Sequence, residues 1–200
     1  MGFRALRVIN EDRVAPGKGF GPHAHRDMEI LTYVIEGSLL HRDSTGAQHT
    51  IRPNEIQIMS AGNGVVHSEF NASTTDPVHF FQIWILPADE DLRPGYQQIG
   101  FDPAEKEGGL RLLAAPWIKN GQCVTIHQNA FVYAAQLKSG RELTHVLDAN
   151  RYSWVQMTKG SASVNSQLMQ EGDGAAISEE RELRIAGAPS GCEFLLFDLP

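Results

Sequence analysis

The sequence predicts an all-β protein that contains two copies of one β-barrel unit. Short runs of β-branched and aromatic residues recur along the 200-residue chain, and turn residues separate them at short intervals. No long window has the periodicity of an amphipathic helix. A weak internal repeat relates the two halves, because residues 33–38 resemble residues 156–161 and a polar, hairpin-like segment follows each stretch.

The expected strands share a high content of apolar, β-branched and aromatic side chains. In chain order they are residues 30–35, 56–59, 79–85, 152–157 and 193–197. Between the halves, residues 87–109 are polar and rich in proline and glycine. We interpret this segment as the connection between the two units.

The composition excludes several classes of protein. A formal net charge of −7 argues against a nucleic-acid-binding surface, which normally carries a basic patch. Residues 1–7 lack the apolar region of a secretory signal, and no apolar stretch approaches the length of a membrane span. We therefore expect a cytoplasmic protein with no membrane partner. Cys123 and Cys192 are far apart and form no CxxC motif, which favours buried thiols over a disulfide.

Two short motifs point to a metal site. His23 and His25 are two residues apart, as are His67 and Glu69. In a strand, residues i and i+2 point to the same face, so each motif projects two donor groups in one direction. If both strands face the same interior, three imidazoles and one carboxylate converge, and that donor set suits a divalent transition metal. No such pair occurs after residue 69, so the second half is expected to be structural.

The remaining histidines and aromatic residues carry weaker signals. His41 and His49 flank a hairpin-like segment, which indicates exposed side chains. His79 begins an apolar strand and is a candidate for a pocket wall, with core packing as the alternative. Trp84 fits a core position better than a platform for a substrate.

The two motifs lie within longer stretches that resemble a known family. Residues 17–37, with Gly17, the two histidines, Glu29 and Gly37, resemble the first cupin motif, and residues 64–71 resemble the second. Within cupins, residues 23–34, 59–69 and the closing 195–200 are similar to the pirin family. The resemblance spans nearly the whole chain and is densest over residues 17–86.

The resemblance implies a bicupin, a protein with two cupin-type β-barrels. We expect an N-terminal cupin domain with the metal site at residues 1–105, and a degenerate cupin-like domain without metal ligands at residues 106–200. Pirins usually carry a further segment before the part that matches Met1. Their ligands, carried over by position, are His23, His25, His67 and Glu69, the same four that the spacing selects.

The metal implied by the resemblance is iron, although the donors also permit manganese, nickel, copper, cobalt or zinc. Because Glu69 takes the carboxylate position in pirins, Glu29 is expected to support a ligand or to form a salt bridge between strands. Asp27 is the other candidate for a side chain that hydrogen-bonds to a ligand histidine and so fixes its orientation.

The resemblance implies a quercetin 2,3-dioxygenase, which opens the flavonol ring and releases carbon monoxide. The substrates would be a flavonol and dioxygen, and Glu69 is the candidate base for the flavonol hydroxyl. A second hypothesis is a non-catalytic regulatory protein that acts through a protein partner, and a third is a cupin isomerase or epimerase in which the metal is absent or structural. Family members are usually described as monomers, so we expect a monomer with no direct nucleic-acid contact.

Overall fold

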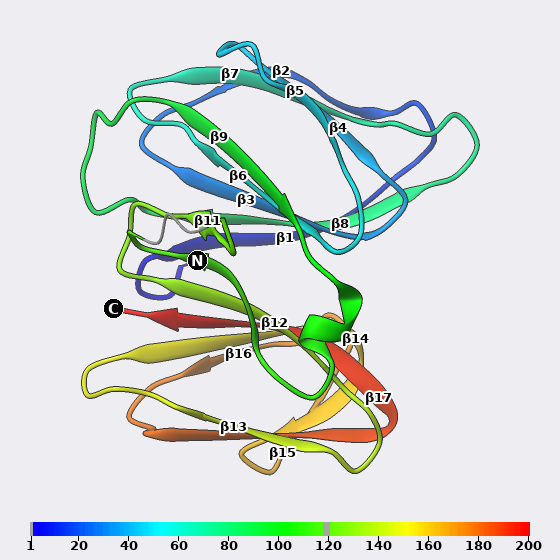
Figure 1. Ribbon diagram of the computed structural model, residues 1–200, viewed down its shortest axis with the longest axis vertical. Helices are drawn as coiled ribbons and strands as arrows, with labels where there is room; N and C mark the ends of the chain where they lie inside the picture. Colours follow the sequence, from blue (N-terminus) through cyan, green and yellow to red (C-terminus); the bar gives the residue numbers. More distant parts are fainter. Residues whose placement is uncertain (1, 118–120) are drawn as a thin grey trace. The chain divides into compact units, whose positions relative to one another are not determined.

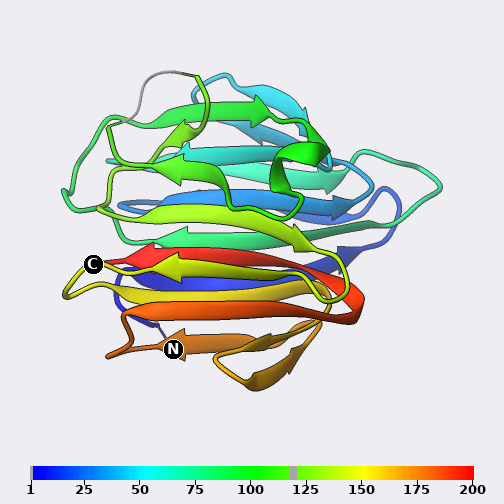
Figure 2. The same ribbon diagram turned by 60° about the horizontal axis from the view of Figure 1, so that its bottom comes forward.

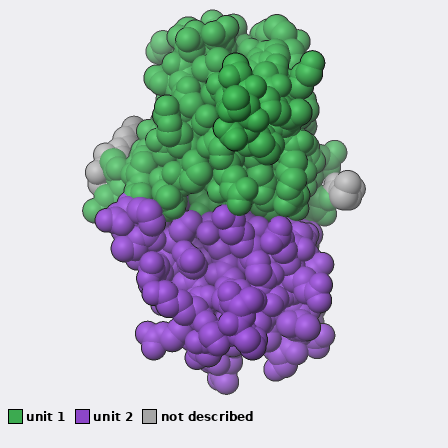
Figure 3. Space-filling model, turned by 90° about the vertical axis from the view of Figure 1, so that its right-hand side faces the viewer, with its two compact units in different colours: residues 1–101, 116–128 green, residues 102–115, 129–200 purple. Residues whose placement is uncertain are grey.

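The computed structural model describes residues 2–117 and 121–200, and apart from one short 3-10 helix its regular elements are strands (Figure 1). The predicted all-β class is therefore confirmed. Contacts divide the chain into two compact units, residues 1–101 with 116–128 and residues 102–115 with 129–200 (Figure 3). The boundary between residues 105 and 106 stays a prediction.

Two sheets build the first unit. One has the order β1-β8-β3-β6-β9 and the other β2-β7-β4-β5, and adjacent strands in each order are antiparallel. The strands are β1 (Leu6–Val14), β2 (Gly19–His25), β3 (Glu29–Glu36), β4 (Leu39–Asp43), β5 (Gln48–Ile51), β6 (Glu55–Ser60), β7 (Val65–Asn71), β8 (Val78–Ile85) and β9 (Gly95–Gly100).

Strands β3, β6 and β8 form the buried centre of the first sheet and contain the first three runs that the sequence predicts. Leu31 pairs with Ile58 on one side and with Ile83 on the other, and all three side chains are fully buried. Such apolar cross-strand neighbours stabilise a sheet because they bury surface together.

Two glycines of the repeated stretches, Gly37 in the turn after β3 and Gly160 at an irregularity within one long strand, have the same physical requirement. Gly37 and Gly160 both have positive φ, +77° and +67°. A Cβ atom would lie 2.6 Å from the carbonyl oxygen of Pro77 at Gly37, and 2.2 Å from that of Gly191 at Gly160. Only glycine fits such a conformation and such an approach, which explains why both copies of the repeat keep it.

The second unit is one sheet built around the long β17. The order β10-β12-β17-β14-β15 forms its main path, while β13 pairs with β17 and β16 with β14 (Figure 2). Its strands are β10 (Arg111–Ala115), β12 (Phe131–Leu137), β13 (Glu142–Val146), β14 (Tyr152–Val164), β15 (Gln167–Gln170), β16 (Gly174–Ile177) and β17 (Glu182–Leu199). Val155, Met157, Phe194 and Leu196 lie in one apolar core. Both predicted runs of this half are strands.

The segment predicted as a connection contains more structure than the sequence indicates. Strand β9 pairs with β6, and the 3-10 helix η1 (Pro103–Lys106) follows it. The polar side chains of β9 find partners within the unit: Tyr96 donates to Gln98 (2.6 Å), and Gln98 donates to Glu55 (2.8 Å). A polar strand between glycines has no apolar alternation to reveal it.

Cys123 and Cys192 are buried, as expected. Within the part of the chain that the structure describes, no helix has the length and apolar character needed to cross a membrane.

Candidate metal centre

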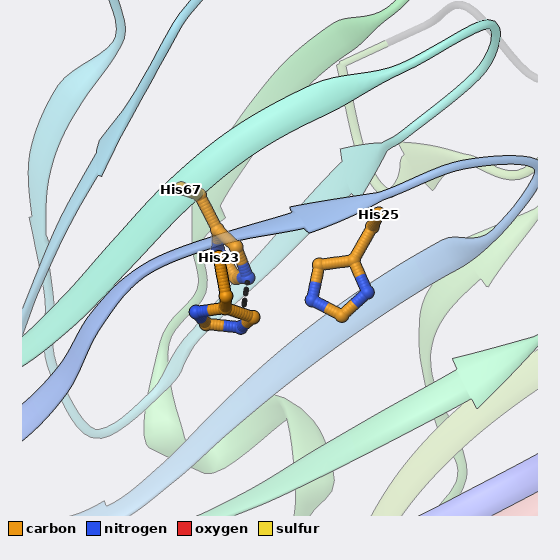
Figure 4. A group of neighbouring side chains, drawn as sticks. All are labelled: His23, His25 and His67. Atoms are coloured by element: carbon orange, nitrogen blue, oxygen red, sulfur yellow. Dashed lines mark hydrogen bonds between the residues drawn. The ribbon is translucent and has the colours of Figure 1, made fainter.

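Three histidines on two neighbouring strands form the candidate metal centre. His23 and His25 end β2, and His67 lies in β7, which pairs with β2 so that His23 is directly opposite His67. The alternation of a strand turns His23 and His25 to one side, and the cross-strand pairing places His67 beside them (Figure 4).

The three imidazoles converge closely. Their ring centroids are 4.4 Å apart for His23 and His67, 4.8 Å for His23 and His25, and 4.9 Å for His25 and His67. One ring nitrogen from each lies within 4.8 Å of the others. The two Nε2 atoms of His23 and His67 are 3.0 Å apart (Figure 4).

The backbone fixes the proton of His23. Its Nδ1 lies 2.8 Å from the carbonyl oxygen of Gly21. Because a carbonyl oxygen can only accept, Nδ1 carries a hydrogen, and in the neutral ring the lone pair is then on Nε2. That lone pair points toward His67 and the middle of the cluster.

The surroundings keep the other two rings neutral. Burial lowers the pKa of His25, and the neighbouring His23 lowers it further. Burial also lowers the pKa of His67 to about 3, with smaller contributions from the three nearby histidines His23, His25 and His41. Imidazoles must be neutral to bind a metal, so these rings meet that condition at neutral pH.

The histidines fit a divalent transition ion by their chemistry and by their unmet hydrogen bonds. Nε2 of His25 is buried and has no hydrogen-bond partner, although an unpaired buried nitrogen is costly. A metal ion would use this lone pair together with that of His23.

Glu69 lies in β7, two residues after His67, but it falls in a different group from His23 and His25. Its carboxylate shares a buried cluster with His41 and His67, in which one ligand atom from each lies within 4.8 Å of the others. Gln82 of β8 donates to Glu69, and Trp84 donates to Gln82 (3.2 Å), so Gln82 is fixed with its amide nitrogen toward the carboxylate.

Burial dominates the electrostatics of Glu69. It raises the pKa of Glu69 to about 7, against the hydrogen bond from Gln82, and the charge of Asp12 raises it further. The carboxyl group of the metal-free protein is therefore poised to exchange a proton near neutral pH.

His41 is not exposed, contrary to the sequence-based prediction, whereas His49 is. His41 and Asp43 both lie in β4, and the side chains of both are completely buried, with His41 Nε2 2.8 Å from Asp43 Oδ2. The spacing of this pair is the signal that sequence reasoning missed, because residues i and i+2 of one strand share a face.

The pKa values of this pair follow from its burial and hydrogen bonds. Burial lowers the pKa of His41 and outweighs the influence of Asp43. Burial alone would raise the pKa of Asp43, but hydrogen bonds from Thr45 and His41 outweigh it, so the pKa is lowered. The pair is therefore a neutral imidazole and an ionised carboxylate.

The other candidate residues lie apart from the three imidazoles. Asp27 accepts from the backbone nitrogen of Asp91 (2.8 Å) and from the Arg26 guanidinium (3.1 Å). His79 is 2.9 Å from the carboxylate of Glu11.

Glu29 contacts Ser60 and His127. Its buried carboxylate accepts from Ser60 Oγ (3.1 Å) and from the backbone nitrogen of His127 (3.1 Å), and it lies 3.2 Å from the His127 ring.

A surface cavity of about 350 Å³ opens beside the cluster. It is lined by Ala24, His25, Arg26, Ser44, Gly64, Val65 and Val66. Trp84, expected in the core, places its ring edge-on to His25 with 4.9 Å between centroids. His25 therefore contacts both this cavity and the Trp84 ring, which does not itself line the cavity.

Known proteins are similar to this chain over both units. A family described as Pirin matches residues 1–85, and one described as Quercetinase C-terminal cupin domain matches residues 112–199. A protein of Escherichia coli (strain K12) named quercetin 2,3-dioxygenase is 43% identical over 200 residues, covering 100% of this chain and 84% of that protein. A Pasteurella multocida protein named putative quercetin 2,3-dioxygenase is 44% identical over 200 residues, covering 98% and 83%.

A solved structure extends the likeness to a metal. The crystal structure of the bacterial pirin YhhW from Escherichia coli in complex with nickel(II) matches with a TM-score of 0.92 and 42% identity, over 100% of this chain and 84% of that chain. Together with the three converging imidazoles, this likeness identifies the histidine cluster as a divalent metal site.

Proposed function

This chain belongs to the pirin family of bicupins, and from that membership we propose that it is a metal-dependent quercetin 2,3-dioxygenase. The observation that carries the proposal is the cluster of three converging imidazoles in the first unit, within the residues that match the family. Its support is the full-length likeness, at 43% identity, to a protein that bears this name.

The proposed ligands are His23, His25, His67 and Glu69, and the proposed metal is iron. The histidines already converge, and Glu69 lies near His67 in the adjoining group. When bound, a divalent ion of this kind supplies Lewis acidity and open positions for oxygen donors. Nickel is the metal named for the relative, so the identity of the metal is itself part of the proposal.

The protein residues would bind the flavonol and manage its proton. Glu69 would accept the proton of the flavonol 3-hydroxyl, with Gln82 holding the carboxylate in place. Trp84 would pack against the flat ring system from beside His25.

The overall reaction balances without a further reductant. Quercetin and dioxygen give a depside and carbon monoxide: the two oxygen atoms of dioxygen enter the opened product, and one ring carbon leaves with its oxygen. As extensions of the same proposal, the protein acts as a monomer in the cytoplasm on small-molecule substrates.

The test is turnover of quercetin in air by protein loaded separately with iron, manganese or nickel, followed by flavonol absorbance and by carbon monoxide release. We expect turnover by the loaded protein and none by His67→Ala. The matched control is His49→Ala, an exposed histidine on strand β5 of the same sheet, which should keep the activity. No turnover with any of the metals would contradict the proposal and would favour a regulatory protein.

A further inference from the structure

We propose that His41, held by Asp43, is a positioning residue for the metal centre. In this proposal, His41 Nδ1 accepts the hydrogen that His67 carries on Nδ1 once His67 Nε2 binds a metal. The inference rests on the proposed ligand role of His67 and adds a partner behind that ligand.

The proton of His67 must change position when a metal binds. In the metal-free protein His23 has its hydrogen on Nδ1, held by Gly21, so its Nε2 can only accept. His67 Nε2, 3.0 Å away, is therefore the donor of that hydrogen bond. Metal binding needs the lone pair of the same Nε2, so the hydrogen has to move to Nδ1.

The new position needs an acceptor. His67 Nδ1 is buried and has no hydrogen-bond partner. A histidine that binds a metal almost always donates its other ring hydrogen to a partner, because a buried donor left unpaired is costly. The side chain behind His67 therefore decides how stable the metal-binding tautomer is.

His41 offers an acceptor of the required kind. Asp43 Oδ1 accepts from the backbone nitrogen (2.9 Å) and the hydroxyl (2.6 Å) of Thr45, while Asp43 Oδ2 faces His41 Nε2 at 2.8 Å. The carboxylate thus holds the His41 hydrogen on Nε2 and leaves a lone pair on Nδ1. His41 Nδ1 is also buried and without a partner.

The two unpaired nitrogens belong to neighbouring rings. The centroids of His41 and His67 are 5.4 Å apart, and one nitrogen of each ring lies within 4.8 Å of the other. We assign this approach to the two unpaired Nδ1 atoms, which a small ring rotation or one bridging water would join. The hydrogen only moves from Nε2 to Nδ1 of His67, so no proton is gained or lost in the change.

Tyr96 contacts both His41 and its cross-strand neighbour His49, with ring centroids 5.0 Å from His41 and 4.9 Å from His49. His49 therefore shares the aromatic contact of His41 but is exposed, which makes it a matched control.

The first experiment measures Zn(II) affinity by competition with a chelator. We expect His41→Phe to weaken binding about 10- to 100-fold, the usual loss when a partner behind a ligand is removed. His41→Asn should keep most of the affinity because its carbonyl oxygen can take the place of Nδ1. Asp43→Asn should weaken binding, since its amide can donate to His41 Nε2 and so move the His41 hydrogen to Nδ1. His49→Phe should bind as the wild type does.

The outcomes distinguish a failure of the role proposed for His41 from a failure of the metal site. Unchanged Zn(II) affinity in a folded His41→Phe, with binding lost in His67→Ala, would overturn the role of His41 alone. Unchanged affinity in His67→Ala would overturn the site as well.

A second measurement does not depend on the folding of any variant. In Zn(II)-loaded wild-type protein with ¹⁵N-labelled histidines, nuclear magnetic resonance should place hydrogen on His67 Nδ1 and on His41 Nε2. Hydrogen on His41 Nδ1, or none on His67 Nδ1, would overturn the proposal.

Discussion

At the scale of single residues, the alternation of side chains along a strand carries most of what the sequence could predict. His23, His25 and His67 come together because two motifs with the same spacing lie on paired strands. The same rule applied to His41 and Asp43 would have placed both on one face, but their hairpin-like surroundings favoured exposure. The hydrogen bond from Gln82 to Glu69 could not be predicted, since it joins strands from opposite sheets.

Glu69 should make the stability of the metal-free protein depend on pH. Its pKa is about 7 in the folded protein against 4.5 when exposed, so its stabilising contribution is complete below pH 4.5 and is lost as the pH rises through about 7. The loss is on the order of 3 kcal/mol of unfolding free energy.

Urea denaturation of wild-type and Glu69→Gln proteins, both metal-free, from pH 4.5 to 8 measures this effect. The lowered pKa of His67 acts in the opposite direction, because acid then favours the unfolded state, but it acts in both proteins. Wild-type stability should therefore fall relative to the variant as the pH rises. A constant difference between the two proteins would show that burial does not raise the pKa of Glu69.

At the scale of elements, apolar runs bounded by turns predicted the buried strands β3, β6 and β8 but not the polar β9. A buried strand must be apolar to join the core, so its composition reveals it. Strand β9 instead satisfies its side chains with hydrogen bonds such as that of Gln98 to Glu55. Those partners are distant in the sequence and leave no periodic pattern.

The turn after β3 gives a test of close backbone approach. Gly37→Ala should destabilise the fold by clearly more than Gly46→Ala, because both glycines have positive φ but only Gly37 faces a carbonyl oxygen at 2.6 Å. Positive φ alone costs about 1–2 kcal/mol for a residue with a Cβ atom. Denaturant midpoints of the two variants provide the comparison, and equal losses would show that the approach of Pro77 is unimportant.

The contact of Glu29 with His127 should hold this part of the 116–128 segment against strand β3 of the first unit. Glu29→Ala leaves the buried Ser60 hydroxyl and the His127 backbone amide without this acceptor, which costs about 1–3 kcal/mol for the buried hydroxyl. Faster hydrogen exchange at the His127 amide would detect the loosening. The control is Glu36→Ala at the exposed end of the same strand, which should leave that amide protected.

At the scale of the whole molecule, the repeat predicted two units of one kind, and the likeness of Gly37 and Gly160 gives that repeat a physical reason. The assignment of residues 116–128 to the first unit could not be predicted. It depends on contacts such as that of His127 with Glu29, which chain order and composition do not encode.

Metal removal should lower the thermal stability of the protein. A ligand that binds only the folded state raises the free energy of unfolding by about 2.7 kcal/mol when its free concentration is one hundred times its dissociation constant. For a chain of this length, that corresponds to a shift of about 5–10 °C in melting temperature. Calorimetry with and without a chelator should show this loss and its recovery on adding nickel(II), while His25→Ala should respond to neither.

The central claim is that one divalent ion binds among His23, His25 and His67. Anomalous diffraction at the absorption edge of the metal, from crystals of the loaded protein, tests it most directly. The account predicts one strong peak at about 2.0–2.2 Å from a ring nitrogen of each histidine. A peak elsewhere, or none among these three side chains in fully loaded protein, would contradict it.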